Sequence, residues 1–301
     1  MLPNLSVLRQ PLRGVILHRM KKAQSEKVRW RDLTDPCRYF LIQKGEKDMN
    51  KIELKIGDCR ELMKEINDGS IDLILTDPPY NISSSQKIIR NEGKFGKAKT
   101  INYDFGEWDY GNISPNAWVP LAVSKLKDNG VFISMVGKRE AENMMKTLEE
   151  SGMFIRHLGC WCRTNPVPQI RKVKWMSGTE LFVIATKNRG GGHHFNYEEG
   201  QHPDYILTPI CMGNERKMWG HPTQKPEKLF EIFVRWWSFR NDVVLDPFAG
   251  SGTTGKCCQN LGRNCILFEK DTRWKFVIEK RLMSNNQNLQ YFMKEGKEKI
   301  K

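Results

Sequence analysis

The chain has 301 residues, of which 49 are Lys or Arg and 35 are Asp or Glu, so its formal net charge is +14. This length allows one large core, or one core with a small appended lobe. The positive charge favours a polyanionic partner such as nucleic acid, although a basic surface without any such partner has the same composition. No apolar run approaches the roughly 20 residues that span a bilayer, and no signal peptide is recognisable, so neither a membrane span nor secretion is expected.

The cysteines and histidines do not indicate a metal site. Eight cysteines in a chain of this length indicate core or surface thiols in a reducing compartment. The pairs Cys160/Cys162 and Cys257/Cys258 lack the two-residue gap of a zinc knuckle. His193 and His194 lie in a glycine run without helical spacing, which predicts solvated loop histidines. We therefore predict no metal, and a reducing compartment such as the cytoplasm.

The two ends of the chain differ in character from its middle. Residues 1–48 contain eleven Lys or Arg and five Asp or Glu with poor periodicity, which predicts a basic and partly ordered arm. Residues 286–301 form a second basic tail. A single domain is expected over residues 49–285.

Between these ends, strand and helix patterns alternate in chain order. The predicted strands cover residues 51–56, 71–76, 130–135, 155–163, 180–185, 243–245 and 264–269. The predicted helices cover residues 60–66, 116–126, 139–151, 225–238, 253–261 and 272–285. Residues 83–112 and 186–219 are polar and rich in glycine, which predicts long loops. The alternation of βαβ units indicates an α/β fold with a mostly parallel sheet.

Asp77, Pro78, Pro79 and Tyr80 follow a strand that reads as buried on both faces. Two prolines remove two backbone donors, so this corner presents acceptor oxygens to a ligand. Such a set of acceptors suits an amino group that donates two hydrogen bonds, and Tyr80 adds a flat face for stacking a planar ring. The alternative is an ordinary Asp-Pro turn that ends a strand.

A second motif begins at Val243 and runs through Thr254, where a short strand leads into a glycine-rich turn and then a helix. Gly250 and Gly252 allow close backbone approach to a ligand, and the helix N-terminus offers unpaired N–H groups. The turn has neither the dinucleotide pattern Gly-x-Gly-x-x-Gly nor the Lys-Ser/Thr pair of a phosphate-binding loop, which weighs against dinucleotides and ATP.

Two carboxylates at other strand ends are further candidates. Glu269 ends the next strand, where an acidic residue accepts hydrogen bonds from ribose hydroxyls. Alternatively, it is a surface glutamate at a strand end. Asp58 follows Gly57 at the first strand terminus, where an ordinary Gly-Asp turn is the stronger interpretation.

These motifs together resemble the amino-directed (N6-adenine/N4-cytosine) DNA methyltransferases, in the β arrangement, in which the catalytic motif precedes the cofactor motif. Residues 161–168 resemble the family's Trp-x-Lys-x-Asn-Pro-x-Pro segment, with Arg163 where Lys is usual. Residues 180–185 resemble the strand that follows it, and residues 221–226, His-Pro-Thr-Gln-Lys-Pro, resemble the segment before the cofactor strand. The likeness covers about residues 50–282.

The resemblance implies a fold and a set of site residues. The fold would be the α/β type of S-adenosylmethionine-dependent methyltransferases, with a mostly parallel seven-stranded sheet and a circularly permuted motif order. The catalytic residues implied are Asp77, Pro78, Pro79 and Tyr80. The implied S-adenosylmethionine site comprises Asp58, Cys59, Asp77, Thr223, Lys225, Asp246, Phe248, Ala249, Gly250, Ser251, Gly252, Thr253, Glu269 and Lys270.

The resemblance also implies the reaction and the partner. An Asp at position 77 favours N6 of adenine over N4 of cytosine, on a base flipped out of double-stranded DNA. The class includes restriction-modification enzymes and many homodimers. Residues 186–219 stand where the family places its target-recognition region, and a basic stretch with Trp175 precedes them, either to read bases or only to contact phosphates. Trp108 is a second stacking wall or a simple loop anchor.

Three alternatives remain on the sequence alone. A cytosine-N4 methyltransferase shares every residue named above. An enzyme acting on RNA or on a protein amide is disfavoured, because protein-amide relatives usually carry Asn before the two prolines. A catalytically silent DNA-binding relative is the third alternative, although Asp77, Gly250, Gly252 and Glu269 are all present.

Overall fold

A computed structural model of the chain describes residues 50–80, 113–168, 173, 175–212, 219–221 and 223–284, and the backbone of 87–88 and 101–102. The chain divides between Met49 and Asn50, and the described residues all belong to the second unit. The predicted arm 1–48, the tail 286–301 and most of the predicted loop 83–112 with Trp108 lie outside the described residues.

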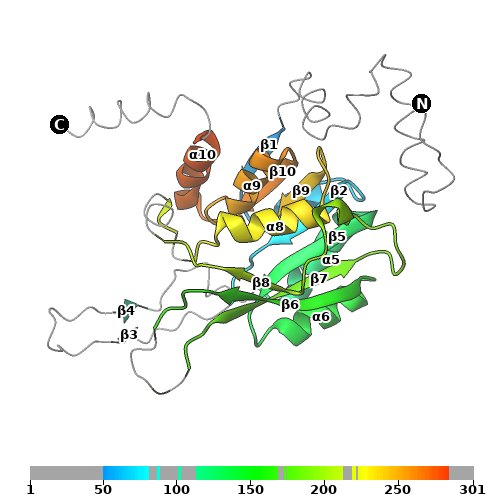
Figure 1. The fold of residues 1–301 in the computed structure, drawn as a ribbon. Helices are drawn as coiled ribbons and strands as arrows, with labels where there is room; N and C mark the ends of the chain where they lie inside the picture. The colour runs from blue at the N-terminus through cyan, green and yellow to red at the C-terminus, as the bar shows by residue number, and fades with distance from the viewer. Residues whose placement is uncertain are drawn as a thin grey trace, which may run out of the picture. The chain divides into compact units, whose positions relative to one another are not determined.

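One eight-stranded sheet runs through the molecule in the order β1-β10-β9-β2-β5-β7-β6-β8 (Figure 1). Its strands are β1 Ile52–Ile56, β2 Ile71–Thr76, β5 Leu126–Val136, β6 Phe154–Arg163, β7 Thr179–Thr186, β8 Tyr205–Thr208, β9 Val243–Asp246 and β10 Asn264–Glu269. All neighbouring pairs are parallel except the two pairs that β7 makes with β5 and β6. A separate antiparallel pair joins β3 Lys87–Ile88 to β4 Ile101–Asn102.

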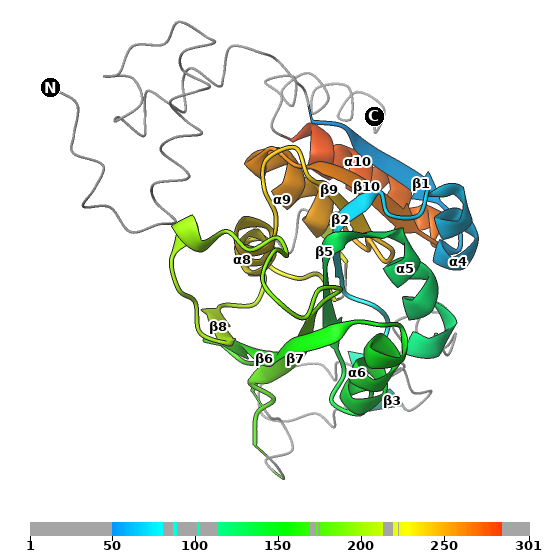
Figure 2. The same ribbon diagram turned by 90° about the vertical axis from the view of Figure 1, so that its right-hand side faces the viewer.

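Helices cover both faces of the sheet, because each face presents apolar side chains that water would otherwise contact. One core lies under α8 Glu227–Trp237, α9 Thr253–Leu261 and α10 Lys275–Met283. The other lies under α4 Cys59–Leu62, α5 Val119–Lys125 and α6 Ala141–Glu150. Figure 2 shows α5 and α6 on the side of the sheet away from α8. Short 3-10 turns lie at Met63–Glu65, Pro115–Ala117, Tyr197–Glu199 and Thr272–Trp274.

Alternation of apolar residues explains how one strand serves both cores. Every residue of β2 is buried. Leu73 and Leu75 belong to the core under α8, whereas Ile74 between them belongs to the core under α5. Ile71 also lies in the core under α5, and the pairing with β5 shifts register between Ile71 and Leu73. A strand buried on both faces is expected at the centre of a doubly covered parallel sheet.

The predicted architecture is confirmed as α/β with a mostly parallel sheet, but the prediction of seven strands is wrong. The eighth strand, β8, lies within residues 186–219, which the sequence predicts as loop. Only four residues long, β8 alternates exposed and buried positions at the edge of the sheet, where it pairs with β6. Its pattern is too short to stand out in a polar stretch. Strand β5 begins at Leu126, four residues before the predicted start, because Lys127 to Gly130 continue its extended backbone.

Among the described residues, no helix has the length and apolar character needed to cross a membrane.

Candidate functional site

The two predicted motifs meet at the carboxyl ends of two neighbouring strands in the middle of the sheet. Strand β2 pairs in parallel with β9, with Leu73 opposite Val244 and Ile74 opposite Leu245. The carboxyl ends of both strands therefore lie side by side, although they are far apart in the chain. Asp77 follows β2 and the glycine-rich turn follows β9, so both open onto one edge, where α/β folds bind ligands.

Asp246 ties these two strand ends together. Its Oδ1 accepts hydrogen bonds from Thr76 Oγ1 at 2.7 Å and from the Phe248 N–H at 3.0 Å, and its Oδ2 accepts one from Thr254 Oγ1 at 2.5 Å. Burial raises the pKa of Asp246 to about 6, against the effect of these hydrogen bonds. Since its oxygens bond to the protein, Asp246 shapes the turn as well as lining the site.

The glycines of the turn are required by its backbone. Gly250 has φ of 53° and Gly252 has φ of 76°, both in the left-handed region that disfavours other residues. A Cβ on Gly252 would lie 3.0 Å from Ile278 Cγ2, and a Cβ on Gly250 would lie 3.4 Å from His221 Nε2. The predicted order of a short strand, a glycine-rich turn and a helix is confirmed.

A cavity of about 810 Å³ lies at this edge and contains most of the predicted site residues. Of the residues that the resemblance implies, those lining it are Asp58, Cys59, Asp77, Pro79, Thr223, Lys225, Asp246, Phe248, Ala249, Gly250, Ser251, Thr253, Glu269 and Lys270. Pro78, Tyr80 and Gly252 do not line it. The volume falls in the range of small-molecule sites, roughly 300–1,000 Å³.

Glu269 lies at the end of β10 with its carboxylate fixed by the backbone. Its Oε2 accepts a hydrogen bond from the Gly250 N–H at 2.8 Å and its Oε1 accepts one from the Asp271 N–H at 2.8 Å. Burial raises the pKa of Glu269 to about 7. A carboxylate has about four lone-pair directions, so each oxygen keeps capacity for one hydroxyl of a ligand.

Asp58 and Cys59 line the cavity from the turn after β1. Asp58 accepts three hydrogen bonds from Arg60, and these bonds lower the pKa of its carboxyl. The buried Cys59 thiol has its pKa raised to about 12 by burial, so it stays protonated and contributes as an apolar surface. Lys270 Nζ lies 3.5 Å from Asp58 Oδ2 at the exposed rim.

Two lining residues that the sequence reasoning did not single out carry unpaired polar atoms. Both amide atoms of Gln224 and the Nε1 of Trp274 are buried and find no hydrogen-bond partner among the described residues. Buried polar groups are rarely left unpaired, and these two side chains line the site with hydrogen-bonding capacity that the described residues do not use. Gln224 lies within the segment 221–226 that resembles the family, and this resemblance is the sequence feature that could have identified it as a site residue.

The predicted catalytic residues Asp77 to Tyr80 lie beside two further charged side chains, Lys225 and Glu180. Asp77 Oδ1 accepts a hydrogen bond from Tyr80 Oη at 2.7 Å, and Asp77 Oδ2 pairs with Lys225 Nζ at 2.5 Å. Lys225 Nζ also lies 5.3 Å from the centre of the Tyr80 ring and 3.3 Å from Glu180 Oε2. Burial alone would lower the pKa of Lys225, but Asp77 and Glu180 together raise it.

Other contacts around the site come from residues that were not predicted as site residues. Arg163 pairs with Glu180. Arg281, fully buried in α10, donates to the Ser251 carbonyl at 3.2 Å and to Thr253 Oγ1 at 2.9 Å, and so braces the glycine turn. An isolated Arg in a helix carries no sequence signal for such a role.

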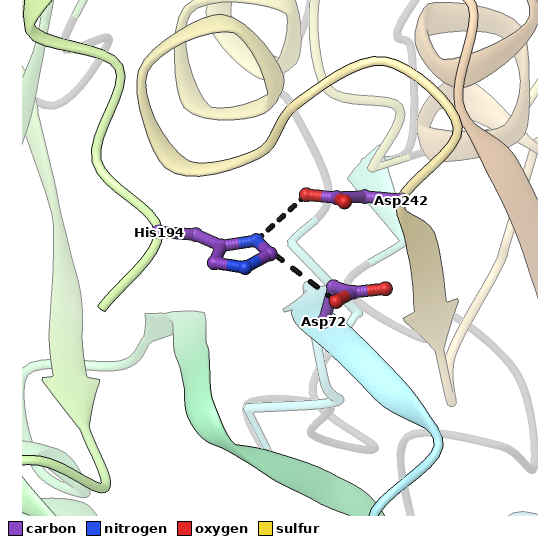
Figure 3. Close-up of side chains that lie close together, drawn as sticks. All are labelled: Asp72, His194 and Asp242. Atoms are coloured by element: carbon purple, nitrogen blue, oxygen red, sulfur yellow. Dashed lines mark hydrogen bonds and ion pairs between the residues drawn. The ribbon is translucent and has the colours of Figure 1, made fainter. Parts of the chain in front are cut away.

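Three side chains lie close enough together to hold a metal ion at the amino ends of β2 and β9, opposite to the end that carries Asp77. Figure 3 shows the His194 ring between the carboxylates of Asp72 and Asp242. However, Lys127 Nζ lies 2.8 Å and 2.9 Å from the two oxygens of Asp72, and His194 Nδ1 lies 2.7 Å from Asp242 Oδ2. With a lysine on the buried carboxylate, these residues form an ion-pair network that joins β2 to the start of β9.

The prediction that His193 and His194 are solvated is therefore wrong. The His194 side chain is 14% exposed and pairs with Asp242, which raises its pKa. The His193 ring stacks on Trp237, with centroids 6.0 Å apart. The glycines beside them suggested an open loop, but the segment folds back onto α8 and the turn before β9.

Comparison with known proteins places the chain among enzymes. The family model described as DNA methylase matches residues 71–280. The chain is 30% identical over 263 residues to the Type II methyltransferase M2.DpnII of Streptococcus pneumoniae, covering 82% of this chain and 95% of that protein. It is 31% identical over 241 residues to the Type II methyltransferase M2.LlaDCHI of Lactococcus lactis subsp. cremoris, covering 75% of this chain and 87% of that protein.

Solved structures agree on the fold. The crystal structure of an M1.HpyAVI–SAM complex matches with a TM-score of 0.61 at 26% identity, covering 77% of this chain and 99% of that chain. The PvuII DNA methyltransferase, described as cytosine-N4-specific, matches with a TM-score of 0.61 at 21% identity, covering 80% of this chain and 91% of that chain.

Proposed function

Since the chain belongs to the DNA methylase family, we propose that it transfers the methyl group of S-adenosylmethionine to the N6 amino group of adenine in a specific DNA sequence. The observation that carries this proposal is the shared edge at which Asp77 and the Gly250 turn line one cavity. One strand end offers acceptors to an amine, and the other offers a cradle to its methyl donor.

The cavity fits S-adenosylmethionine by its chemistry. When bound there, this cofactor would supply an electrophilic methyl group on a positively charged sulfur. Glu269 would accept the ribose hydroxyls with the lone pairs that the Gly250 and Asp271 N–H groups leave free. The unpaired amide of Gln224 would bond the polar amino-acid end, and Phe248 would contact the adenine ring. Acidic side chains around the cavity, Asp58 and Asp77 among them, favour a cationic ligand.

Asp77 would hold the target amino group. An exocyclic amine of a base is a poor nucleophile, because its lone pair is delocalised into the ring. Acceptance of its hydrogens by the Asp77 carboxylate and by the Pro78 carbonyl favours a tetrahedral nitrogen with an available lone pair, which stabilises mainly the transition state. Tyr80 would stack on the flipped base. Since Tyr80 Oη bonds to Asp77 in this structure, the amino group and the phenol would compete for the same oxygen.

Adenine is the proposed target because Asp is the first residue of the corner. The base would flip out of the duplex at a cost of a few kcal/mol. The net charge of +14 supports phosphate contacts. We assign sequence readout to residues 186–219 and to the segment around Trp175, whose side chain is 95% exposed; Arg171, Lys172 and Lys174 beside it lie outside the described residues. Because the proposed reaction acts on DNA, we propose a location in the cytoplasm or on the nucleoid; the homodimer stays a prediction.

The test is transfer of a labelled methyl group from S-adenosylmethionine to double-stranded DNA, followed by digestion and identification of the modified nucleoside. N6-methyladenine is expected, and Asp77→Ala should reduce the rate by about a thousandfold or more while cofactor affinity persists. Detection of N4-methylcytosine would show that the target base is cytosine and not adenine. Full turnover in the Asp77→Ala variant would refute the assignment of the corner.

A further inference from the structure

Asp77 belongs to a row of four charged side chains that alternate in sign. Lys225 Nζ lies 2.5 Å from Asp77 Oδ2 and 3.3 Å from Glu180 Oε2. Arg163 pairs with the other oxygen of Glu180. The side chains are 19%, 7%, 22% and 14% exposed from Asp77 through Lys225 and Glu180 to Arg163. Poorly solvated charges interact strongly, so removing the charge of Arg163 or Glu180 should change the electrostatic potential at Asp77.

Glu180 contacts Lys225 on the side of the ammonium group that faces away from the cavity residues. Glu180 is the second residue of β7, opposite Trp161 of β6, and is not among the residues that line the cavity. A ligand in the cavity therefore meets Asp77 and Lys225 but not Glu180. The route from Glu180 to Asp77 runs through the ammonium group that the two carboxylates share.

We propose that Glu180 is a positioning residue for methyl transfer: it draws the Lys225 ammonium partly away from Asp77, so that Asp77 remains a strong acceptor for the target amino group. This inference rests on the proposed function, since it assumes that Asp77 receives that amino group. A lysine held by one carboxylate alone would occupy Asp77 Oδ2 fully, and a carboxylate that is so well paired accepts further hydrogen bonds weakly. Arg163 sets how much of the Glu180 charge remains for Lys225.

The charges that face Asp77 predict how its acidity responds. They are Lys225 from the segment before α8, Glu180 from β7 and Asp246 from β9, and the uncharged Tyr80 hydroxyl donates a hydrogen bond from the same turn. Burial raises the pKa of Asp77, Lys225 lowers it and Glu180 raises it. Neutralising Glu180 should therefore lower the pKa of Asp77. Neutralising Arg163 should raise it, because a positive charge is lost from the row.

The test measures the single-turnover rate of DNA methylation against pH for Glu180→Gln and Arg163→Gln in the full chain. Transfer requires ionised Asp77, so the rate falls on the acid side as Asp77 protonates. Glu180→Gln should move this acid limb to lower pH and reduce the maximal rate by about tenfold. Arg163→Gln should move the acid limb to higher pH. Opposite shifts from two neighbouring neutralisations are not expected of damage to the fold, which would move both variants alike.

Glu65→Gln is the matched control. It removes a carboxylate that pairs with Lys55 at 2.9 Å on the exposed surface, so it changes the net charge for DNA as Glu180→Gln does. Its pH profile should equal that of the unmodified chain. An acid limb of Glu180→Gln that stays in place or moves to higher pH would overturn the inference. If Glu180→Gln does not fold, the acid limb of Arg163→Gln decides: a shift to higher pH supports the inference and no shift overturns it. Absence of DNA methylation by the unmodified chain would instead overturn the proposed function.

Discussion

Thr76 Oγ1 donates a hydrogen bond of 2.7 Å to Asp246 Oδ1, across 170 positions of the chain. Thr76 is the last residue of β2, and Asp77 follows it at once. Asp246 is the last residue of β9, and the glycine turn follows it. This buried bond therefore fixes the corner that would hold the target amine relative to the turn that would hold the methyl donor. In-line transfer depends on that relative placement, because small displacements of reacting groups cost large factors in rate.

Replacing Thr76 with Val should weaken both stability and cofactor binding. The change leaves Asp246 Oδ1 with only the Phe248 N–H, so we expect a loss of about 1–3 kcal/mol in the free energy of unfolding. Urea denaturation and calorimetry with S-adenosylmethionine measure the two effects. Thr147→Val is the control: buried Thr147 Oγ1 bonds to the Asn143 carbonyl of its own helix and to Asn116 Oδ1, and none of these residues lines the cavity, so its loss should leave cofactor affinity unchanged. Equal losses of cofactor affinity in the two variants would refute the special role of Thr76.

Replacing Gly252 with Ala should damage the cofactor turn. The φ of 76° costs an alanine about 1 kcal/mol or more, and its Cβ would lie 3.0 Å from Ile278 Cγ2. Gly69→Ala separates the two causes, because Gly69 has φ of 65° but nothing within 4 Å of an added Cβ. Denaturation should show the larger loss for Gly252→Ala. Affinity for S-adenosylmethionine should fall by about tenfold or more in that variant alone. Unchanged affinity would show that the turn does not hold the cofactor.

Glu269 should make the stability of the chain depend on pH. Burial raises its pKa from the ordinary value of 4.5 to about 7, so the native state binds a proton more readily than the unfolded state does. Its contribution to stability is therefore fully present below pH 4.5 and is lost as pH rises through 7. Between about pH 5 and 8, the free energy of unfolding of Glu269→Gln should fall less steeply than that of the unmodified chain.

The same carboxylate should link cofactor binding to pH. Ionised Glu269 is the better acceptor for ribose hydroxyls, so affinity for S-adenosylmethionine should fall as the pH drops below about 7. Calorimetry across this range should show that dependence in the unmodified chain and a flatter one in Glu269→Gln. Parallel profiles in the two proteins would mean that another group controls the linkage.

His194 should stabilise the fold without serving the reaction. Its hydrogen bond to Asp242 raises its pKa above 6.5, so its contribution is fully present below that value and is lost as pH rises through the raised pKa. His194→Phe keeps the ring volume and should cost about 1 kcal/mol near pH 5.5 and less near pH 9, as measured by denaturation. DNA methylation should be unchanged, because His194 pairs with Asp242 at the ends of the strands opposite to Asp77, so it lies outside the part of residues 186–219 that would read DNA. A similar cost at both pH values would exclude the ion pair as its origin.

The sequence alone determined the local elements and the chemistry of single segments. Strands β2 and β10 and helix α9 begin and end at the predicted residues. Apolar periodicity, buried runs and glycine turns depend on neighbours within about ten positions, so they can be recognised without a fold. For the same reason, the Asp77 corner and the Gly250 turn were recognisable as separate motifs. That their order reflects a circular permutation stays a prediction.

Only the tertiary structure decided which distant side chains share an environment. None of Glu180, Arg163 and Arg281 was predicted as a site residue, although the first two lie in segments that resemble the family. Pairing of β6 with β7 and packing of α10 bring them to the site. Edge strand β8 forms because β6 offers it a partner, and His194 is shielded because β9 begins beside it. Burial, strand pairing and the alternation of charges arise between residues far apart in the chain. They depend on coordinates, and no local pattern of residues encodes them.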